Sequence, residues 1–244
     1  MSWELVVLFI LLALIAEILG TIGGFGSSLF FIPIAGFFLD FHTVLGITGL
    51  FHVSSNLSKI ALFRKGIDKK LIIYLGVPAV IFVIIGAYFS NKVQSEYLEI
   101  GLSIFLIFTS LVFLIFKTFS IKPSIKNSVI GGVLSGGVAG ILGTGGAIRG
   151  ITLSAFNLTP AVFIATSAVI DLGVDASRSV VYILNGYVHQ HDLYLIPFLI
   201  GASFVGTYIG KKILTKVSDK RFKSMVLVLV LLTGLSTIFK VIFG

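Results

Sequence analysis

The sequence predicts an all-α polytopic membrane protein built from two inverted-topology repeats, each with a glycine-broken helical hairpin and three transmembrane helices. Three observations favour this class. Hydrophobic residues make up 57% of the chain and charged residues only 11%, whereas soluble domains are about a quarter charged. Long uncharged runs recur along the whole chain, and a cluster of glycines occurs twice, about 120 positions apart.

The uncharged runs have the length of membrane spans, since a helix needs about 20 apolar residues to cross the hydrocarbon core. Stretches without Asp, Glu, Lys or Arg cover residues 18–39, 71–90, 100–116, 129–148, 150–170 and 193–210. The first segment carries Glu4 and Glu17 and lacks a basic region, so we interpret it as mature structure rather than a signal peptide. No room is left for a sizeable soluble domain.

Each half is predicted to hold a glycine-broken pair of segments followed by three full helices. In the first half we expect the pair at 4–20 and 26–39, then helices at 43–64, 70–90 and 96–117. In the second half we expect the pair at 128–141 and 146–156, then helices at 160–185, 193–210 and 224–242. Because an inverted repeat needs an odd number of crossings per half, each pair must begin and end on one side. Arms of about 13–17 residues favour a re-entrant hairpin or two short, tilted crossings.

The two halves, residues 1–120 and 121–244, match beyond the glycines. Gly66 matches Gly186, and Gly86-Ala-Tyr88 matches Gly206-Thr-Tyr208. Where a loop of one half is basic, its counterpart in the other half is not. This alternation indicates that the halves lie in opposite orientations across the membrane.

The net charge of +8 is distributed as a topology signal. Thirteen of the 18 basic residues lie in three short connections, around 64–70, 117–126 and 211–223. Basic loops stay in the cytoplasm, so we expect these three inside and both termini outside, in a multi-pass protein of the cell membrane. Nucleic-acid binding would require a soluble basic face, and we exclude it.

The glycine clusters are predicted to form the binding site. Glycine is unfavourable inside a helix, and unwound backbone in a bilayer occurs only where protein or a wet cavity surrounds it. A duplicated break is the best sequence pointer to a transporter's site, which we expect near the midplane at the repeat interface. Neither cluster has the Gly-Lys-Ser/Thr ending of a phosphate-binding loop, so we expect no enzyme activity driven by ATP.

Two polar stripes are spaced to share one helix face each. His52, Asn56 and Lys59 are at i, i+4 and i+7, and their partners 119 positions later are Asp171, Asp175 and Arg178. A charge at the bilayer centre costs about 2.5–3.5 kcal/mol, so these groups must face protein or water. Either they lock helices together, with Asp175 on Arg178 and Asp171 on a cation such as Lys59, or they line the transport path. Asp171 or Asp175 could then carry a coupling proton.

Arg149 follows the second glycine cluster, within the first turn of the predicted half-helix. Helix N-termini attract anions, and a guanidinium there completes a two-part oxyanion site. The alternatives are that Arg149 is the counter-ion of Glu17 or that it reaches toward the membrane interface.

A duplicated motif resembles the TauE/SafE family of sulfite exporters and toluene-sulfonate-uptake permeases. The first copy is Gly23-Gly24-Phe-Gly26, Pro33, Gly46-Ile-Thr48-Gly49 and Lys65-Gly66-Ile67-Asp68, and the second is Gly143-Thr-Gly145-Gly146, Pro160, Ala165-Thr166-Ser167 and Asn185-Gly186-Tyr-Val188. The resemblance covers nearly the whole chain. It implies a secondary transporter of small anions such as sulfite or organosulfonates.

The predicted site combines the motif residues with the polar stripes. For substrate binding we expect Gly23, Gly24, Gly26, Ser27, Thr48, Asn56, Lys59, Gly143, Thr144, Gly145, Gly146, Arg149, Thr166, Ser167 and Arg178. The competing hypothesis is a cation or metal permease, or a passive channel, that uses Asp171 and Asp175. We expect no cofactor or resident metal. Coupling to protons or sodium and assembly into a homo-oligomer are both compatible with the sequence.

Overall fold

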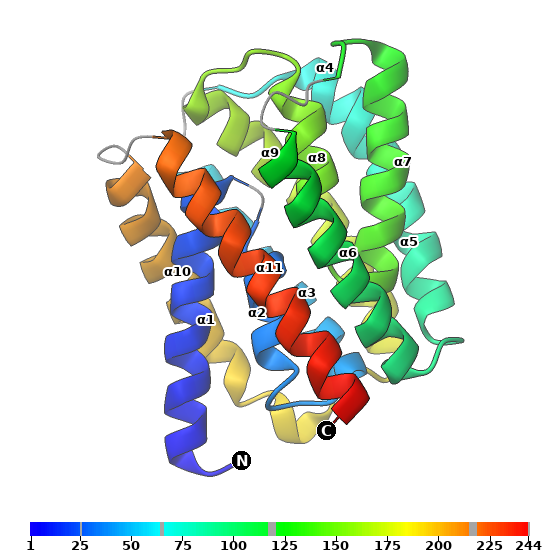
Figure 1. The fold of residues 1–244 in the computed structure, drawn as a ribbon, viewed down its shortest axis with the longest axis vertical. Helices are drawn as coiled ribbons and strands as arrows, with labels where there is room; N and C mark the ends of the chain where they lie inside the picture. The colour runs from blue at the N-terminus through cyan, green and yellow to red at the C-terminus, as the bar shows by residue number, and fades with distance from the viewer. Residues whose placement is uncertain (25, 64–65, 117–120, 215–218, 244) are drawn as a thin grey trace.

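The protein is a bundle of helices in the computed structural model, which describes residues 1–24, 26–63, 66–116, 121–214 and 219–243. The described residues contain helices and loops without any strand, which confirms the all-helical class. The helices are α1 (Trp3–Gly23), α2 (Ser28–Ala35), α3 (Phe41–Leu62), α4 (Lys69–Leu71), η1 (Ile72–Gly76), α5 (Val77–Ser90), α6 (Ser95–Ile115), α7 (Ile125–Leu142), α8 (Gly146–Ser154), α9 (Pro160–Leu184), η2 (Gln190–Asp192), α10 (Leu195–Leu214) and α11 (Asp219–Phe243) (Figure 1).

Several of these helices are suited to a bilayer. Among the described residues, five helical segments are long and apolar enough to cross a membrane: Trp3–Gly23, Lys69–Ser90, Ser95–Ile115, Ile125–Leu142 and Pro160–Leu184. Helices α3 and α10 have 22 and 20 residues, which is also sufficient length. Large apolar side chains on the outside, such as those of Phe108, Ile115 and Leu184, remain exposed. Such a surface belongs in lipid.

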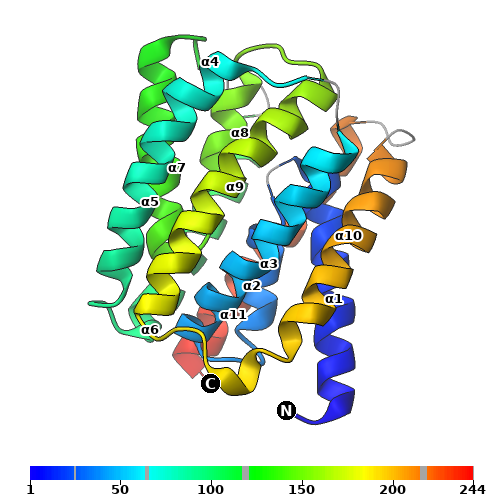
Figure 2. The ribbon, with the colours of Figure 1, turned by 180° about the vertical axis from the view of Figure 1, so that it is seen from behind.

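The helix ends gather at two ends of the molecule (Figures 1 and 2). At one end, called here the terminal end, lie both chain termini and the turns after α2, α5 and α9. At the other, called here the basic end, α3, α6 and α10 finish and α4, α7, α9 and α11 begin. Lys69, Lys122, Lys126 and Lys211 belong to the basic end. The predicted loop residues Arg64, Lys65, Lys117 and Lys216 lie outside the described residues, as do the side chains of Lys220, Arg221 and Lys223.

Each glycine break separates a full-length helix from a half-helix. Helices α1 and α7 have 21 and 18 residues, and α2 and α8 have only 8 and 9. The expectation of arms of 13–17 residues was therefore wrong. Gly20 and Gly23 stay helical, and the helix ends one residue later because Gly24 has a φ of 74°, as Gly143 does with 78° after α7. At 1.5 Å per residue, the half-helices reach less than halfway through the hydrocarbon core.

The third helix of the chain starts at a strong cap. The Asp40 carboxylate accepts a hydrogen bond from the Thr43 backbone N–H at 3.1 Å and another from the Thr43 hydroxyl. Burial raises the pKa of Asp40, but these hydrogen bonds outweigh it and leave the pKa below its ordinary value. The cap fixes the start of α3, which carries one of the two polar stripes.

The predicted helix at 70–90 is interrupted by a π turn. Residues 72–76 form this turn between α4 and α5. Pro78 has no N–H to donate to a carbonyl in the preceding turn, and a widened turn accommodates the missing bond.

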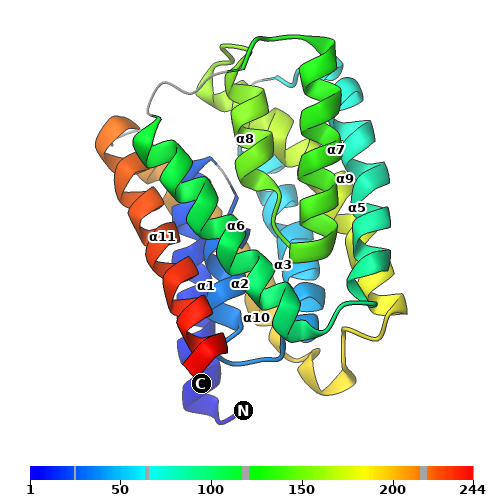
Figure 3. The same ribbon diagram turned by 45° about the vertical axis from the view of Figure 1, so that its right-hand side comes forward.

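Close packing at glycines holds the bundle together. Helix α5 packs most extensively against α7, α1 against α10, α6 against α11, and α3 against α9 (Figure 3). A Cβ at Gly136 or Gly140 of α7 would lie 2.2 or 2.3 Å from a carbonyl oxygen of α5. A Cβ at Gly206 or Gly210 of α10 would lie 2.8 Å from a side-chain carbon of α1. These contacts place α3 and α9, and with them the polar stripes, in the middle of the molecule.

Candidate functional site

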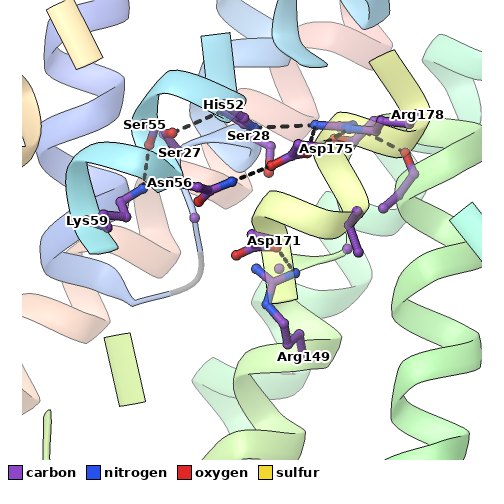
Figure 4. A pocket seen from close by; sticks show the side chains of 16 residues that line it. Ser27, Ser28, His52, Ser55, Asn56, Lys59, Arg149, Asp171, Asp175 and Arg178 are labelled. Atoms are coloured by element: carbon purple, nitrogen blue, oxygen red, sulfur yellow. Dashed lines mark hydrogen bonds and ion pairs between the residues drawn. The ribbon is translucent and has the colours of Figure 1, made fainter. Parts of the chain in front are cut away.

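The two polar stripes meet where α3 crosses α9. The Asn56 Nδ2 donates to Asp175 Oδ2 at 2.7 Å, and these two residues are 119 positions apart. A cavity of about 30 Å³ lies beside this contact (Figure 4). It is lined by Gly26, Ser27, Ser28, His52, Ser55, Asn56, Lys59, Ala139, Gly143, Gly145, Gly146, Arg149, Asp171, Val174, Asp175 and Arg178. This volume holds water molecules rather than an organic ligand.

Arg178 is bound to Asp175 and to the end of α7. Its Nε and Nη2 each lie 2.7 Å from Asp175 Oδ1, which confirms the predicted pair at i, i+3. Its Nη1 donates to the carbonyl of Gly143 and, at 3.3 Å, to that of Ala139. Carbonyls at a helix C-terminus have no partner within the helix. Arg178 therefore supplies a donor to the Gly143 carbonyl and a further one to the Ala139 carbonyl, which also accepts from the Gly143 N–H, and so connects α9 to the second break.

Arg149 pairs with Asp171. A guanidinium nitrogen contacts the Asp171 carboxylate, and Nε donates to the Ser167 hydroxyl at 3.0 Å. The side chain of Asp171 is 16% exposed, the most of any carboxylate in the cavity. Two predicted alternatives are wrong: Arg149 does not pair with Glu17, and Asp171 does not pair with Lys59.

Glu17 pairs with Lys59, and the distance between Oε1 and Nζ is 2.9 Å. Lys59 also donates to Ser55 Oγ at 2.7 Å. Glu17 lies about two turns before the end of α1 at the first glycine break and is fully buried. The buried cluster thus contains three cations and three carboxylates, each cation on one carboxylate, and it is electrically balanced.

His52 connects the Glu17 and Arg178 groups. Arg178 Nη2 lies 3.4 Å from His52 Nδ1, and a guanidinium only donates, so Nδ1 is the acceptor. His52 Nε2 then carries the proton and donates to Ser27 Oγ at 3.0 Å. Ser27 in turn donates to Glu17 Oε2 at 2.6 Å. A chain of hydrogen bonds therefore crosses the cavity from one half of the sequence to the other.

The two glycine breaks also meet. Ser28, at the start of α2, lies 3.0 Å from Thr144, in the second break, through their hydroxyl oxygens. Ser27 and Ser28 at the start of α2 and Gly145 and Gly146 at the start of α8 all line the cavity. Both half-helices therefore direct their N-terminal ends, with free N–H groups and positive partial charge, toward the same space.

Most of the predicted site residues converge on this space. In the cavity lining are Gly26, Ser27, Asn56, Lys59, Gly143, Gly145, Gly146, Arg149, Arg178, Asp171 and Asp175. Gly24 and Ser167 line a smaller adjoining cavity, and Gly23 lines a third.

Thr48 and Thr166 lie apart from the cavity. The Thr48 hydroxyl donates to the Val44 carbonyl at 2.6 Å, and the Thr166 hydroxyl accepts from the Asp68 backbone N–H at 2.9 Å. Ser28 was not predicted, although its place directly after the first glycine cluster was a usable signal. The hydroxyl-rich surroundings of Glu17 were not predicted either, because they come from separate helices.

A chain of cavities leads from the charged cluster toward the basic end. The adjoining cavity, of about 20 Å³, shares Gly26, Lys59 and Asp171 with the first. It shares Gly24 and Ile164 with a third cavity of about 380 Å³. The lining of the third cavity includes Phe113, Ser154 and Leu214, which lie near the ends of α6, α8 and α10, and Pro160 at the start of α9.

The fold and the site define a polytopic helical membrane protein whose broken helices converge on a buried charged cluster. Residues 9–237 match the sequence profile of the family described as Sulfite exporter TauE/SafE. The chain belongs to this family, and the predicted resemblance is confirmed. Its members are membrane transporters of sulfite-like anions rather than enzymes. Comparison with curated proteins finds no match.

Proposed function

We propose that this protein is a secondary transporter of the cell membrane that carries sulfite or a similar small oxyanion. The anion binds near the midplane of the membrane, at the cavity between the two glycine breaks. Gly26, Ser27, Ser28, Gly145 and Gly146 supply helix N-termini and hydroxyls to it. An anion is stabilised there by backbone N–H donors that need no reorganisation.

The observation that carries this proposal is the position of Arg149 and its pairing with Asp171. It lies within the first turn of α8, at the positive end of that half-helix, and its partner Asp171 is the most exposed carboxylate of the cluster. A planar guanidinium can donate two hydrogen bonds to the oxygens of an oxyanion, just as it does to a carboxylate. The substrate therefore takes the place of Asp171 on Arg149.

Asp171 then becomes a coupling group. Once displaced from Arg149 it would be an uncompensated carboxylate in a buried site, which is strongly unfavourable. Uptake of a proton removes that charge. Asp175 is less suited to this role because Arg178 and Asn56 both hold it. Arg178 accordingly positions the second break instead of binding substrate.

We further propose that residues 1–120 and 121–244 are inverted repeats. In Figures 1 and 2, α1 and α7 run in opposite directions, and so do α3 and α9. In chain order, α1, α3, α5 and α6 of the first half are equivalent to α7, α9, α10 and α11 of the second. The contact of α1 with α10 is therefore equivalent to that of α7 with α5, and the α3–α9 and α6–α11 contacts each join equivalent helices. Two-fold pseudo-symmetry of this kind suits alternating access around a central site. The excess of lysines at the basic end supports a cytoplasmic position for that end.

Sulfite flux into proteoliposomes tests the role of Arg149. Arg149→Ala should lower the flux at least about tenfold, because a hydrogen-bonded charge contributes about 1.5–3 kcal/mol. Arg149→Lys should retain part of it. Lys92→Ala is the matched control, since it removes one positive charge from a lysine that lies over the Tyr88 ring, away from the cavity. Full flux in a folded Arg149→Ala variant would contradict the proposed site.

Asp171→Asn tests the coupling. An inward proton gradient should accelerate sulfite uptake by the unchanged protein, and this acceleration should disappear in the variant because an amide cannot take up the proton. The readout is the ratio of initial rates with and without the gradient. If the ratio is the same in both proteins, Asp171 is not the proton carrier.

The competing hypothesis of a cation or metal permease predicts free carboxylates in the path. Asp171 and Asp175 instead each pair with an arginine. Uptake of divalent metal ions in the same vesicles, without uptake of sulfite, would favour that hypothesis.

A further inference from the structure

Glu17 is surrounded by hydroxyl groups from four separate elements. Its Oε1 lies 2.7 Å from Ser55 Oγ in α3, 3.0 Å from Thr207 Oγ1 in α10 and 3.2 Å from Thr21 Oγ1 in α1. Its Oε2 lies 2.6 Å from Ser27 Oγ at the first break. All of these groups are buried. A single ion pair with Lys59 does not require so many oxygen atoms.

One carboxylate oxygen is overcrowded with donors. Ser55, Thr207, Thr21 and Lys59 all approach Glu17 Oε1, although a carboxylate oxygen has only about two lone pairs to offer. A Ser or Thr inside a helix has another acceptor, the carbonyl four residues earlier. When these hydroxyls turn to that carbonyl, their own lone pairs are free. The site then presents one carboxylate and three hydroxyl oxygens to a hard cation.

The Lys59 ammonium occupies the place that such a cation would take. It lies between Glu17 Oε1, at 2.9 Å, and Ser55 Oγ, at 2.7 Å. Lys59 also lines both the central cavity and the adjoining one, beside Asp171. Its flexible side chain can therefore reach either Glu17 or an anion bound in the cavity.

We propose that Glu17, Thr21, Ser55 and Thr207 form a sodium site that the Lys59 ammonium fills until substrate binds. This inference rests on the proposed function, because the anion is what draws Lys59 away from Glu17. Leaving Glu17 fully buried without a cation would be strongly unfavourable, so Na⁺ enters as Lys59 leaves. A proton would also balance the charge, but a protonated carboxyl group needs only one acceptor and not three hydroxyl ligands.

Thermal unfolding of the Lys59→Met variant in detergent tests this site without substrate. Methionine removes the ammonium and leaves the oxygen ligands, so saturating NaCl should raise Tm by about 3–8 °C over choline chloride at equal ionic strength. The unchanged protein should show little shift, since its own ammonium competes with Na⁺. In the Glu17→Gln/Lys59→Met variant the shift should vanish. An equal shift in both variants, or a response to pH and not to Na⁺, would refute the sodium site.

A second measurement covers the case in which Lys59→Met does not fold. In proteoliposomes, an inward Na⁺ gradient should accelerate sulfite uptake by the unchanged protein, and Thr207→Val should weaken this acceleration at least about threefold. Sulfite uptake that depends on Arg149 but not on Na⁺ would overturn the sodium site and leave the proposed function intact. Stabilisation of Lys59→Met by Na⁺ without any sulfite uptake by the unchanged protein would support the sodium site and contradict the proposed function.

Discussion

Arg149 and Arg178 line the same cavity, yet their guanidinium groups are held in different ways. Arg178 is 1% exposed and donates to a carboxylate and to two main-chain carbonyls at the end of α7. Arg149 donates to a serine and pairs with the partly exposed Asp171. Arg178 therefore holds the backbone through several fixed partners, whereas Arg149 has fewer, as the proposed exchange of Asp171 for a substrate anion requires.

Replacement of Arg178 should destabilise the fold. Arg178→Met leaves Asp175 buried without its cation, and breaking a buried pair in this way costs about 3–5 kcal/mol. The double variant Arg178→Met/Asp175→Leu should recover part of the loss, because it removes the uncompensated charge. Thermal unfolding in detergent measures both. A single variant as stable as the unchanged protein would show that Arg178 does not hold the second break.

At the residue scale the sequence predicted a contact within one helix, because the Asp175–Arg178 pair follows from helical spacing. Asn56 and Asp175 were matched as equivalent positions of the two halves, but their hydrogen bond was not predicted. The pairing of Arg149 with Glu17, one of the alternatives, was wrong, because Arg149 pairs with Asp171 and Glu17 pairs with Lys59. The members of each observed pair lie on different helices at unrelated positions, so the arrangement of the helices decides these pairs and local sequence does not.

Among the elements, α7 shows how glycines set the helix spacing. A Cβ at Gly136 would lie 2.2 Å from the Ala79 carbonyl oxygen of α5, whereas a Cβ at the neighbouring Gly137 would meet nothing within 4 Å. The two glycines have the same helical backbone and differ in what faces them. Gly136 allows the helices to approach, whereas Gly137 has room for a side chain.

Alanine substitutions at these neighbours should have opposite effects. Gly136→Ala should lower the free energy of unfolding by about 1–3 kcal/mol, because α5 and α7 must move apart. Gly137→Ala should leave stability unchanged or raise it by up to about 1 kcal/mol, because alanine favours the helix. Unfolding of both variants under identical conditions checks this difference. Equal stabilities would mean that α7 does not pack on α5 as described.

The sequence predicted most helices to within a few residues, since their ends coincide with charged or glycine-containing loops. It did not predict the unequal arms of the broken pairs. Local composition cannot distinguish a glycine that remains helical, as Gly20 and Gly23 do, from the left-handed Gly24 that ends α1. That difference depends on the tight contact of Gly20 with the backbone around Ser27.

For the whole molecule, the described cavities make one side of the charged cluster more accessible than the other. The chain of cavities leads to the basic end through the space beside Gly24 and Ile164. At the equivalent place in the other half, Ile32 and Leu45 pack directly against Gly143, and both side chains are fully buried. If the halves are inverted repeats, each half can adopt the arrangement of the other. Cavities would then lie beside Gly143, toward the terminal end, and side chains would pack against Gly24, toward the basic end.

Composition and loop charges were sufficient to predict the membrane class and the common side of the basic loops, because both depend on summed transfer energies and not on particular contacts. The side on which cavities adjoin the charged cluster could not be predicted. Both Gly24 and Gly143 lie in glycine-rich segments, yet cavities lie beside Gly24 whereas Ile32 and Leu45 pack against Gly143.

Single-cysteine labelling should reveal this asymmetry, because the chain has no cysteine of its own. Ser154 lines the large cavity at the basic end, and Ala35, its equivalent 119 positions earlier, is fully buried. A membrane-impermeant maleimide should label Ser154→Cys from the cytoplasmic side without substrate and should not reach Ala35→Cys from outside. Sulfite with an inward ion gradient should slow the first reaction and permit the second. Alternating access around this site would be contradicted if sulfite did not change the labelling of Ala35→Cys. It would also be contradicted if both variants were labelled from the same side of the membrane.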